Sequence, residues 1–149
     1  MRFAIYLLTL VFGLLFCGTA FAQTATPMAN PSEALDTMIA AVAARDADAI
    51  AALYTDDALL LGSNSNALSG RKAIRDVWAN NFSGGYSVLE TGNPRTERGT
   101  DRAAVIFVWQ ATIRPNGAAE TFIQGRTMLY FRLAEGGWLI SADMWQPTP

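Results

Sequence analysis

The sequence contains no histidine, and its 149 residues include a single cysteine, Cys17. Without histidine, a Ser-His-Asp triad, a histidine general base and the commonest transition-metal ligand are all excluded. Cys17 lies in a leading segment that we expect to be removed, which would leave no disulfide, no thiol nucleophile and no thiolate metal ligand. Stability then depends on packing alone.

Residues 1–22 have the pattern of a signal peptide. Arg2 gives a basic start, residues 3–16 are almost continuously apolar, and Ala20 and Ala22 supply the small residues that a signal peptidase reads. We therefore expect cleavage after Ala22 and an exported protein, periplasmic or secreted, with no membrane attachment after cleavage. A membrane anchor is the alternative, but the apolar run is shorter than the roughly 20 residues that a spanning helix needs.

Charge does not support a nucleic-acid partner. The chain has 11 basic and 13 acidic residues, a formal net charge of −2, and the cluster of Arg71, Lys72 and Arg75 is offset by Asp76. No basic face suited to a phosphate backbone results. There is no glycine-rich nucleotide loop, and the aspartates of residues 46–57 lack the spacing and closing glutamate of a calcium loop. We expect no cofactor and no bound metal.

The chain after the leader has the length of one domain with a single core. Residues 23–30 have the composition of a flexible tether, and we place the domain at residues 31–147. Its first half predicts helices. The expected spans are residues 31–44, residues 47–54 with Asp46 as the cap, and an amphipathic helix over about residues 69–80.

The second half predicts strands. One short apolar run, residues 58–61, precedes the third helix, and the later strands are expected at residues 86–97, 103–114, 121–133 and 138–145. Gly92-Asn93-Pro94 interrupts the first of these, which favours a bulge or an edge position because proline cannot donate to a ladder. Helices followed by an antiparallel meander indicate an α+β fold.

Alternation along residues 103–114 defines two rows of side chains. The row with Val105, Phe107 and Trp109 is wholly apolar, whereas the row with Ile106 and Val108 turns polar towards its end. One row should pack on helices and the other should be partly solvated or form a dimer contact. The sequence leaves open which is which.

Three segments together resemble a known family. Residues 44–58, residues 70–74 and residues 137–145 are similar to the SnoaL-like and ketosteroid-isomerase-like branch of the nuclear transport factor 2-like superfamily. The resemblance implies a cone with cystatin-like topology, in which a strongly curved sheet wraps over about three N-terminal helices. It also implies a pocket between sheet and helices and, often, a homodimer through the outer face of the sheet.

The resemblance does not extend to the isomerase carboxylates. The general base of ketosteroid isomerases would fall at Leu60, Leu61 or Gly62, and the second carboxylic acid near Leu129. None of these side chains can accept a proton. Steroid isomerisation by the usual two-carboxylate mechanism is therefore not expected.

Asp143 is the strongest candidate for acid–base chemistry. It lies among Trp138, Met144 and Trp145 on a strand built for burial, so it must be paired, protonated or at the mouth of a cavity. A carboxyl facing an apolar cavity would have a raised pKa and could exchange protons near neutral pH. The alternative is an ion pair with an arginine such as Arg71 or Arg126.

Tyr54 is the expected partner of Asp143, because a buried phenol needs an acceptor for its hydroxyl. The competing interpretation places Tyr54 in the core with its hydroxyl on a backbone group. The remaining candidates form two sets. The expected ligand-pocket residues are Leu60, Trp78, Trp109, Tyr130 and Trp145. The expected structural or rim residues are Asp57 and Arg71. Asp57 is expected to be a cap, and Arg71 either forms an ion pair at the pocket rim or is a solvated charge.

These observations leave three functions open. The first is an exported domain that binds a small, mainly apolar molecule, oriented by Asp143 and Tyr54. The second is a cofactor-independent isomerase, dehydratase or cyclase in which Asp143 is the general acid or base. The third is an association module that dimerises through the sheet and catalyses nothing.

Overall fold

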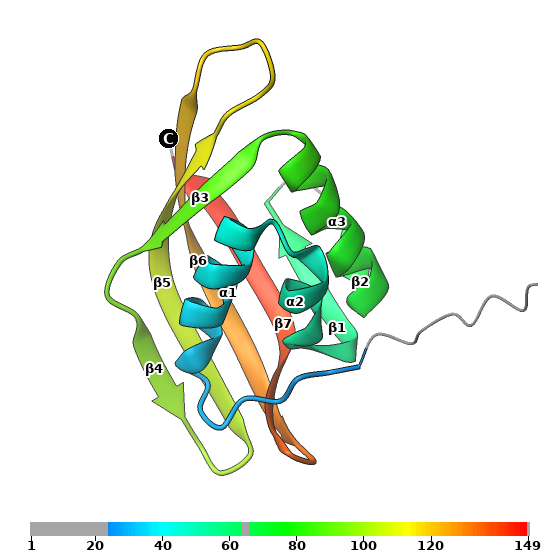
Figure 1. The fold of residues 1–149 in the computed structure, drawn as a ribbon. Helices are drawn as coiled ribbons and strands as arrows, with labels where there is room; N and C mark the ends of the chain where they lie inside the picture. The colour runs from blue at the N-terminus through cyan, green and yellow to red at the C-terminus, as the bar shows by residue number, and fades with distance from the viewer. Residues whose placement is uncertain (1–23, 64–65, 149) are drawn as a thin grey trace, which may run out of the picture.

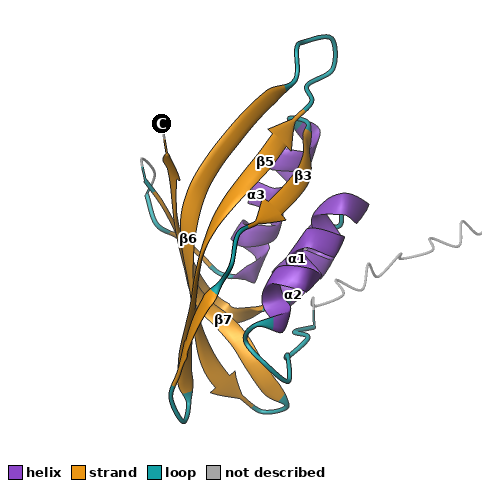
Figure 2. Cartoon of the chain, turned by 90° about the vertical axis from the view of Figure 1, so that its left-hand side faces the viewer, coloured by secondary structure: helices purple, strands orange, loops and turns teal. Residues whose placement is uncertain are grey.

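The computed structural model describes residues 24–63 and 66–148, in which three helices lie against one face of a curved seven-stranded sheet (Figures 1 and 2). The α+β cone predicted from the sequence is confirmed. The predicted signal peptide lies outside the described residues. Within the described part of the chain, no helix is long and apolar enough to span a membrane.

Helix α1, Glu33–Ala44, forms because its apolar residues recur every three or four positions. Leu35, Met38 and Val42 are all buried on the side that faces the sheet. The helix ends where Arg45 adopts a left-handed conformation, with φ of 55°, and its backbone N–H returns to the last turn. The observed start at Glu33 is two residues later than predicted.

Helix α2, Ala47–Ala52, is capped as predicted: the Asp46 carboxylate accepts a hydrogen bond from the Ala49 backbone N–H at 2.8 Å. This helix is shorter than predicted. The prediction that it continues to Tyr54 is wrong, because Tyr54 begins strand β1, Tyr54–Gly62, which pairs with the last strand of the sheet. Tertiary pairing therefore overrides the local helical pattern.

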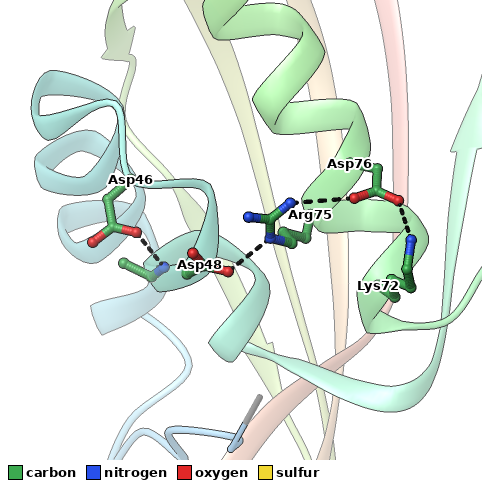
Figure 3. Close-up of polar contacts among 6 residues, drawn as sticks. Asp46, Asp48, Lys72, Arg75 and Asp76 are labelled. Atoms are coloured by element: carbon green, nitrogen blue, oxygen red, sulfur yellow. Dashed lines mark hydrogen bonds and ion pairs between the residues drawn. The ribbon is translucent and has the colours of Figure 1, made fainter. Parts of the chain in front are cut away.

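Helix α3, Arg71–Ser83, packs beside α2 and confirms the amphipathic helix predicted there. Figure 3 shows the polar contacts on its exposed side. Arg75 donates to Asp48 of α2 at 2.8 Å, and Lys72 contacts Asp76 one turn along at 2.6 Å. These partly or fully exposed pairs each contribute little to stability, so the helix is held mainly by its buried residues, including Ile74 and Phe82.

The sheet has the strand order β2-β1-β7-β6-β5-β3, with β4 also paired to β5. β1 and β7 are parallel and the other pairs are antiparallel. The strands after β1 are β2 (Leu68–Ser69), β3 (Tyr86–Thr91), β4 (Arg95–Arg98), β5 (Arg102–Ile113), β6 (Thr121–Ala134) and β7 (Gly137–Thr148).

The edge prediction for Gly92-Asn93-Pro94 is confirmed. β3 and β4 pair with successive parts of β5, with Thr91 opposite Trp109 and Arg95 opposite Ile106. The four residue steps from Thr91 to Arg95 therefore lie opposite the three steps from Trp109 to Ile106 on β5. The segment between β3 and β4 thus contains one extra residue, as in a β-bulge.

Side-chain exposure decides which row of β5 faces the helices. Val105 and Phe107 are buried in the core, whereas Ile106 and Val108 are 42% and 61% exposed on the opposite face. Figure 2 shows that the helices cover only the inner face of the sheet.

The segment before α1 is not a free tether. Met28 is buried and exchanges two backbone hydrogen bonds with Trp138 of β7, at 2.9 and 2.7 Å, and the Thr26 N–H donates to Ala52 O at 2.8 Å. The prediction of a flexible tether over residues 23–30 is therefore corrected for residues 26–28. They form part of the domain, because Met28 covers one end of the core.

Candidate functional site

Two neighbouring strands bring the candidate carboxylate and phenol together. β1 and β7 run parallel, with Leu60 opposite Asp143, and Leu129 of β6 lies opposite Asp143 on its other side. The Tyr54 hydroxyl donates to Asp143 Oδ2 at 2.8 Å. The Tyr54–Asp143 pair predicted from the sequence is present, and the alternative in which Tyr54 donates to a backbone group is wrong.

Asp143 is buried with little to compensate its charge. Its side chain is 5% exposed in total, and Oδ1 has no hydrogen-bond partner among the described residues. Burial raises the pKa of Asp143 from 3.8 to about 6, and the hydrogen bond from Tyr54 opposes that rise. Burial, and then the negative charge of Asp143, raise the pKa of Tyr54 well above its usual range, so the phenol stays a proton donor.

The alternative in which Asp143 pairs with Arg71 or Arg126 is wrong. Arg71 pairs with Asp56 at 2.9 Å, and Arg126 donates to the Gln146 side chain at 2.9 and 3.2 Å. Asp143 therefore combines burial with a single hydrogen-bond donor, Tyr54, on its second oxygen.

Asp143 lines an apolar cavity of about 240 Å³ between the helices and the sheet. It is the only charged side chain among the described residues that surround this space. The lining residues are Met38, Leu60, Val77, Trp78, Asn81, Tyr86, Leu89, Phe107, Trp109, Ile113, Ile123, Thr127, Asp143 and Trp145. A cavity of this kind, apolar with a few convergent polar groups, is typical of a small-molecule site.

The aromatic walls are held in defined positions. The rings of Trp78 and Tyr86 meet edge to face, with centroids 5.5 Å apart and planes at 87°. Across the cavity, Trp109 Nε1 donates to the Thr127 hydroxyl at 3.0 Å. Gly125 lies opposite Trp109 in the ladder, and a Cβ there would come within 2.4 Å of the indole. The glycine therefore allows the indole to lie against β6.

Most of the predicted pocket residues line the cavity. Leu60, Trp78, Trp109 and Trp145 do so, and Tyr54 supports Asp143 from β1. Tyr130 does not. Its neighbours Leu129 and Phe131 point inward, so strand alternation places Tyr130 on the outer face, where it is 40% exposed. The assignment of Tyr130 to the pocket is wrong.

Arg71 forms an ion pair, one of the two alternatives predicted for it, but its partner is Asp56 and neither residue lines the cavity. Arg71 is buried, and its Nε donates to Tyr54 O at 3.1 Å, so the interpretation as a solvated charge is wrong. Asp57 is exposed and forms an ion pair with Arg132 of β6 at 2.5 Å, so it is not the predicted cap. Arg71 fixes the backbone of the residue that donates to Asp143.

The residues that sequence reasoning missed include the other polar members of the cavity lining and one glycine. Thr127, Tyr86 and Asn81 line the cavity, and Gly125 makes room for Trp109. A signal existed for two of them. Thr127 shares the alternating row of β6 that carries the buried Leu129, and a glycine inside a strand often marks a close approach by another group.

No group of three or more acidic, cysteine or histidine side chains that could hold a metal occurs within residues 24–63 and 66–148. The polar side chains that the described part of the site offers are the Asp143 carboxyl with its Tyr54 donor, the Tyr86 phenol, the Thr127 hydroxyl and the Asn81 amide.

Comparisons with known proteins agree with the fold. The profile of the SnoaL-like domain family matches residues 35–140, and the chain belongs to that family. No curated protein sequence matches the chain.

Solved structures share the fold at low sequence identity. A ketosteroid isomerase-like protein from Erwinia carotovora is 20% identical, with 79% of this chain and 94% of that chain covered and a TM-score of 0.67. An NTF2-like superfamily protein from Salmonella enterica is 14% identical, with 78% and 87% covered and a TM-score of 0.70. An NTF2-like protein with a cystatin-like fold from Novosphingobium aromaticivorans is 16% identical, with 77% of each chain covered and a TM-score of 0.66. These likenesses establish the fold, and function has to be argued from the site.

Proposed function

We propose that this domain binds a small, mainly apolar molecule in the cavity between α3 and the sheet. The observation that carries the proposal is the pairing of an apolar cavity of about 240 Å³ with a buried carboxyl, Asp143, whose Oδ1 has no partner among the described residues. A buried polar atom without a partner is costly, and a ligand that supplied one would recover that cost. Tyr54 holds Asp143 in place for such a ligand.

The test is an amide NMR titration with 2-naphthol, a small aromatic probe, using two matched variants. Val77→Phe adds a ring to the cavity wall, whereas Val108→Phe adds the same ring to the exposed outer face of β5. Binding in the cavity predicts shifts at Leu60, Thr127 and Asp143 that persist in Val108→Phe and disappear in Val77→Phe. Shifts confined to the outer face, or none up to the solubility limit, would overturn the proposal.

Proton transfer is a second candidate, favoured by the raised pKa of Asp143, about 6, and by its contact with a phenol. A carboxyl with such a pKa exchanges protons efficiently near neutral pH. Cyclohex-2-enone in D₂O provides the test, with exchange of its acidic C–H protons followed by NMR. Catalysis predicts that wild-type protein accelerates exchange and that Asp143→Asn does not, whereas equal rates would exclude this role.

Homodimerisation is a separate proposal, supported by the outer face of the sheet. Ile106, Val108, Met128, Tyr130 and Met144 expose between 37% and 61% of their surface there. Contiguous exposed apolar surface of this kind favours an interface. Sedimentation of wild type and Val108→Lys tests it. A dimer that the lysine dissociates is expected, and a wild-type monomer at 100-fold varied concentration would exclude it.

Export remains a proposal based on the leader sequence. Secretion-competent bacterial cells expressing the full chain should yield a protein whose intact mass matches cleavage after Ala22. Full-length protein retained in the cytoplasm would contradict it.

A further inference from the structure

The cavity combines one carboxylate with an unusual share of aromatic surface. Trp78 comes from α3, and Tyr86, Phe107, Trp109 and Trp145 come from strands of the sheet. Asp143 is the only charged group among the described lining residues. Whatever occupies this space therefore meets aromatic side chains and a single acid.

The acid lacks a positive partner. Asp143 Oδ2 accepts one hydrogen bond, from Tyr54, and Oδ1 accepts none among the described residues. The two arginines that could have paired with it are occupied elsewhere, Arg71 by Asp56 and Arg126 by Gln146. An ionised carboxylate buried in this way is costly, and a cation brought beside it would offset much of that cost.

The aromatic walls favour the same sign of charge. The face of an aromatic ring carries the negative part of its quadrupole and attracts a cation within about 6 Å of the ring centre. Trp78 and Tyr86 both line the cavity and meet edge to face, with planes at 87° and centroids 5.5 Å apart, so the ring that presents its edge keeps both of its faces uncovered by the other. Trp145 lies two residues beyond Asp143 on the same face of β7, which places a third ring beside the carboxylate.

We propose that the ligand class of this cavity is an organic ammonium ion with a compact apolar or aromatic body. The ammonium group would lie at Asp143 Oδ1, and the body would fill the space between Trp78, Tyr86 and the sheet. This inference rests on the proposed binding function and adds the charge of the ligand to it. An anionic ligand is disfavoured because carboxylate and ring faces repel it together.

The test compares two soluble probes of nearly equal size by calorimetry at pH 7.5. 2-Phenylethylamine carries an ammonium group, and 2-phenylethanol carries a neutral hydroxyl in its place. Wild-type protein should bind the amine at least about tenfold more tightly than the alcohol, since a desolvated cation gains from both the carboxylate and the rings.

Two variants and one control separate the contributions of the carboxylate and the aromatic rings. Asp143→Asn should remove the preference for the amine and leave affinity for the alcohol within about threefold, while Glu135→Gln, which removes an exposed charge in the β6–β7 hairpin, should change neither. Trp78→Leu provides an independent arm and should weaken the amine more than the alcohol.

The outcomes are distinct. Equal or tighter binding of the alcohol would overturn the ammonium inference and leave the binding function standing. An amine preference that survives both Asp143→Asn and Trp78→Leu would also overturn it. Failure of both probes to bind wild-type protein would remove the proposed function together with the inference.

Discussion

Tyr54 and Asp143 are 89 positions apart in the sequence, yet the Tyr54 hydroxyl donates to the Asp143 carboxylate at 2.8 Å inside the protein. The contact joins the first residue of β1 to the centre of β7. Burial raises the pKa of Asp143, and this hydrogen bond opposes the rise because it stabilises the ionised form. The pair therefore sets the charge of the only acid in the cavity lining.

Removing the phenol hydroxyl should raise the pKa of Asp143. In Tyr54→Phe the carboxylate loses its one donor, so the pKa should move above the wild-type value of about 6. NMR of the Asp143 carboxyl carbon through a pH titration measures it. Tyr130→Phe removes the same atom from the outer face and should leave the titration unchanged. A lower pKa in Tyr54→Phe would show that the hydrogen bond does not favour the ionised form.

The stability of the protein should fall between about pH 4 and pH 7 because of Asp143. The folded state keeps this proton up to about pH 6, whereas an unfolded aspartate releases it near pH 3.9. The contribution of protonated Asp143 to the free energy of unfolding is therefore fully present below about pH 4 and is lost as pH rises through 6. The difference between the folded and unfolded pKa of Asp143 corresponds to roughly 3 kcal/mol of unfolding free energy.

Urea unfolding of wild type and Asp143→Asn from pH 4 to pH 8 measures this effect. Asparagine stays neutral and can still accept a hydrogen bond from Tyr54. The unfolding free energy of the variant should therefore increase relative to that of wild type as pH rises. Glu135→Gln controls for the loss of one charge. A constant difference between wild type and Asp143→Asn at every pH would show that another group is responsible.

Gly125→Ala should disturb the cavity wall. The new Cβ would come within 2.4 Å of the Trp109 ring and 2.6 Å of Gln146 O, so the indole must move and its bond to Thr127 should break. We expect a loss of about 1–3 kcal/mol in unfolding free energy and a shifted tryptophan emission maximum. Gly84→Ala has only ordinary contacts at 3.5 Å and is the matched control. Equal stability of the two variants would contradict the predicted clash.

Arg71→Met should destabilise the protein more than Arg75→Met. Arg71 is buried and donates to Tyr54 O, whereas Arg75 makes partly exposed ion pairs. Loss of the Arg71 contacts should lower the unfolding free energy by about 1–3 kcal/mol. Loss of the solvent-screened Arg75 pairs should lower it by much less, and thermal and urea unfolding measure both. Arg71→Met should also perturb the Asp143 titration, because Arg71 positions the backbone of Tyr54. The reverse order of stability would refute this assignment.

Met28→Ala should lower stability by about 2–4 kcal/mol, as expected when a buried side chain leaves a cavity. Met144→Ala, on the outer face where Met144 is 50% exposed, should cost much less. Chemical denaturation of both variants provides the measurement. Equal small losses would mean that the segment before α1 is a tether after all.

Much of the fold was predictable because its signals are local. Helical spacing identified α1 and α3, alternation identified β5, and Gly92-Asn93-Pro94 marked the break in the edge strand. Predictions failed where a distant partner decided the outcome. Tyr54 was assigned to a helix because the residues before it are helical, but pairing with β7 makes it a strand residue.

In the site too, residues with a local sequence signal were predicted, and residues whose role depends on distant neighbours were not. Asp143 stood out because a carboxyl among tryptophans on an apolar strand requires an explanation. Tyr130 was misplaced because the phase of alternation along β6 is fixed by contact with its neighbours and the helices. Thr127 was missed because a threonine in a strand becomes a site residue only when an indole and a cavity lie beside it.

The sequence by itself determined the order of the main helices and strands, the family and the choice of Asp143 as the candidate carboxyl, since each depends on residue type and short-range periodicity. Only the tertiary structure decided that Tyr54 is the partner of Asp143, that Arg71 is buried, that Tyr130 faces outward and that Met28 joins the core. These outcomes depend on which residues the curved sheet brings together across the chain, and short-range patterns do not contain that information.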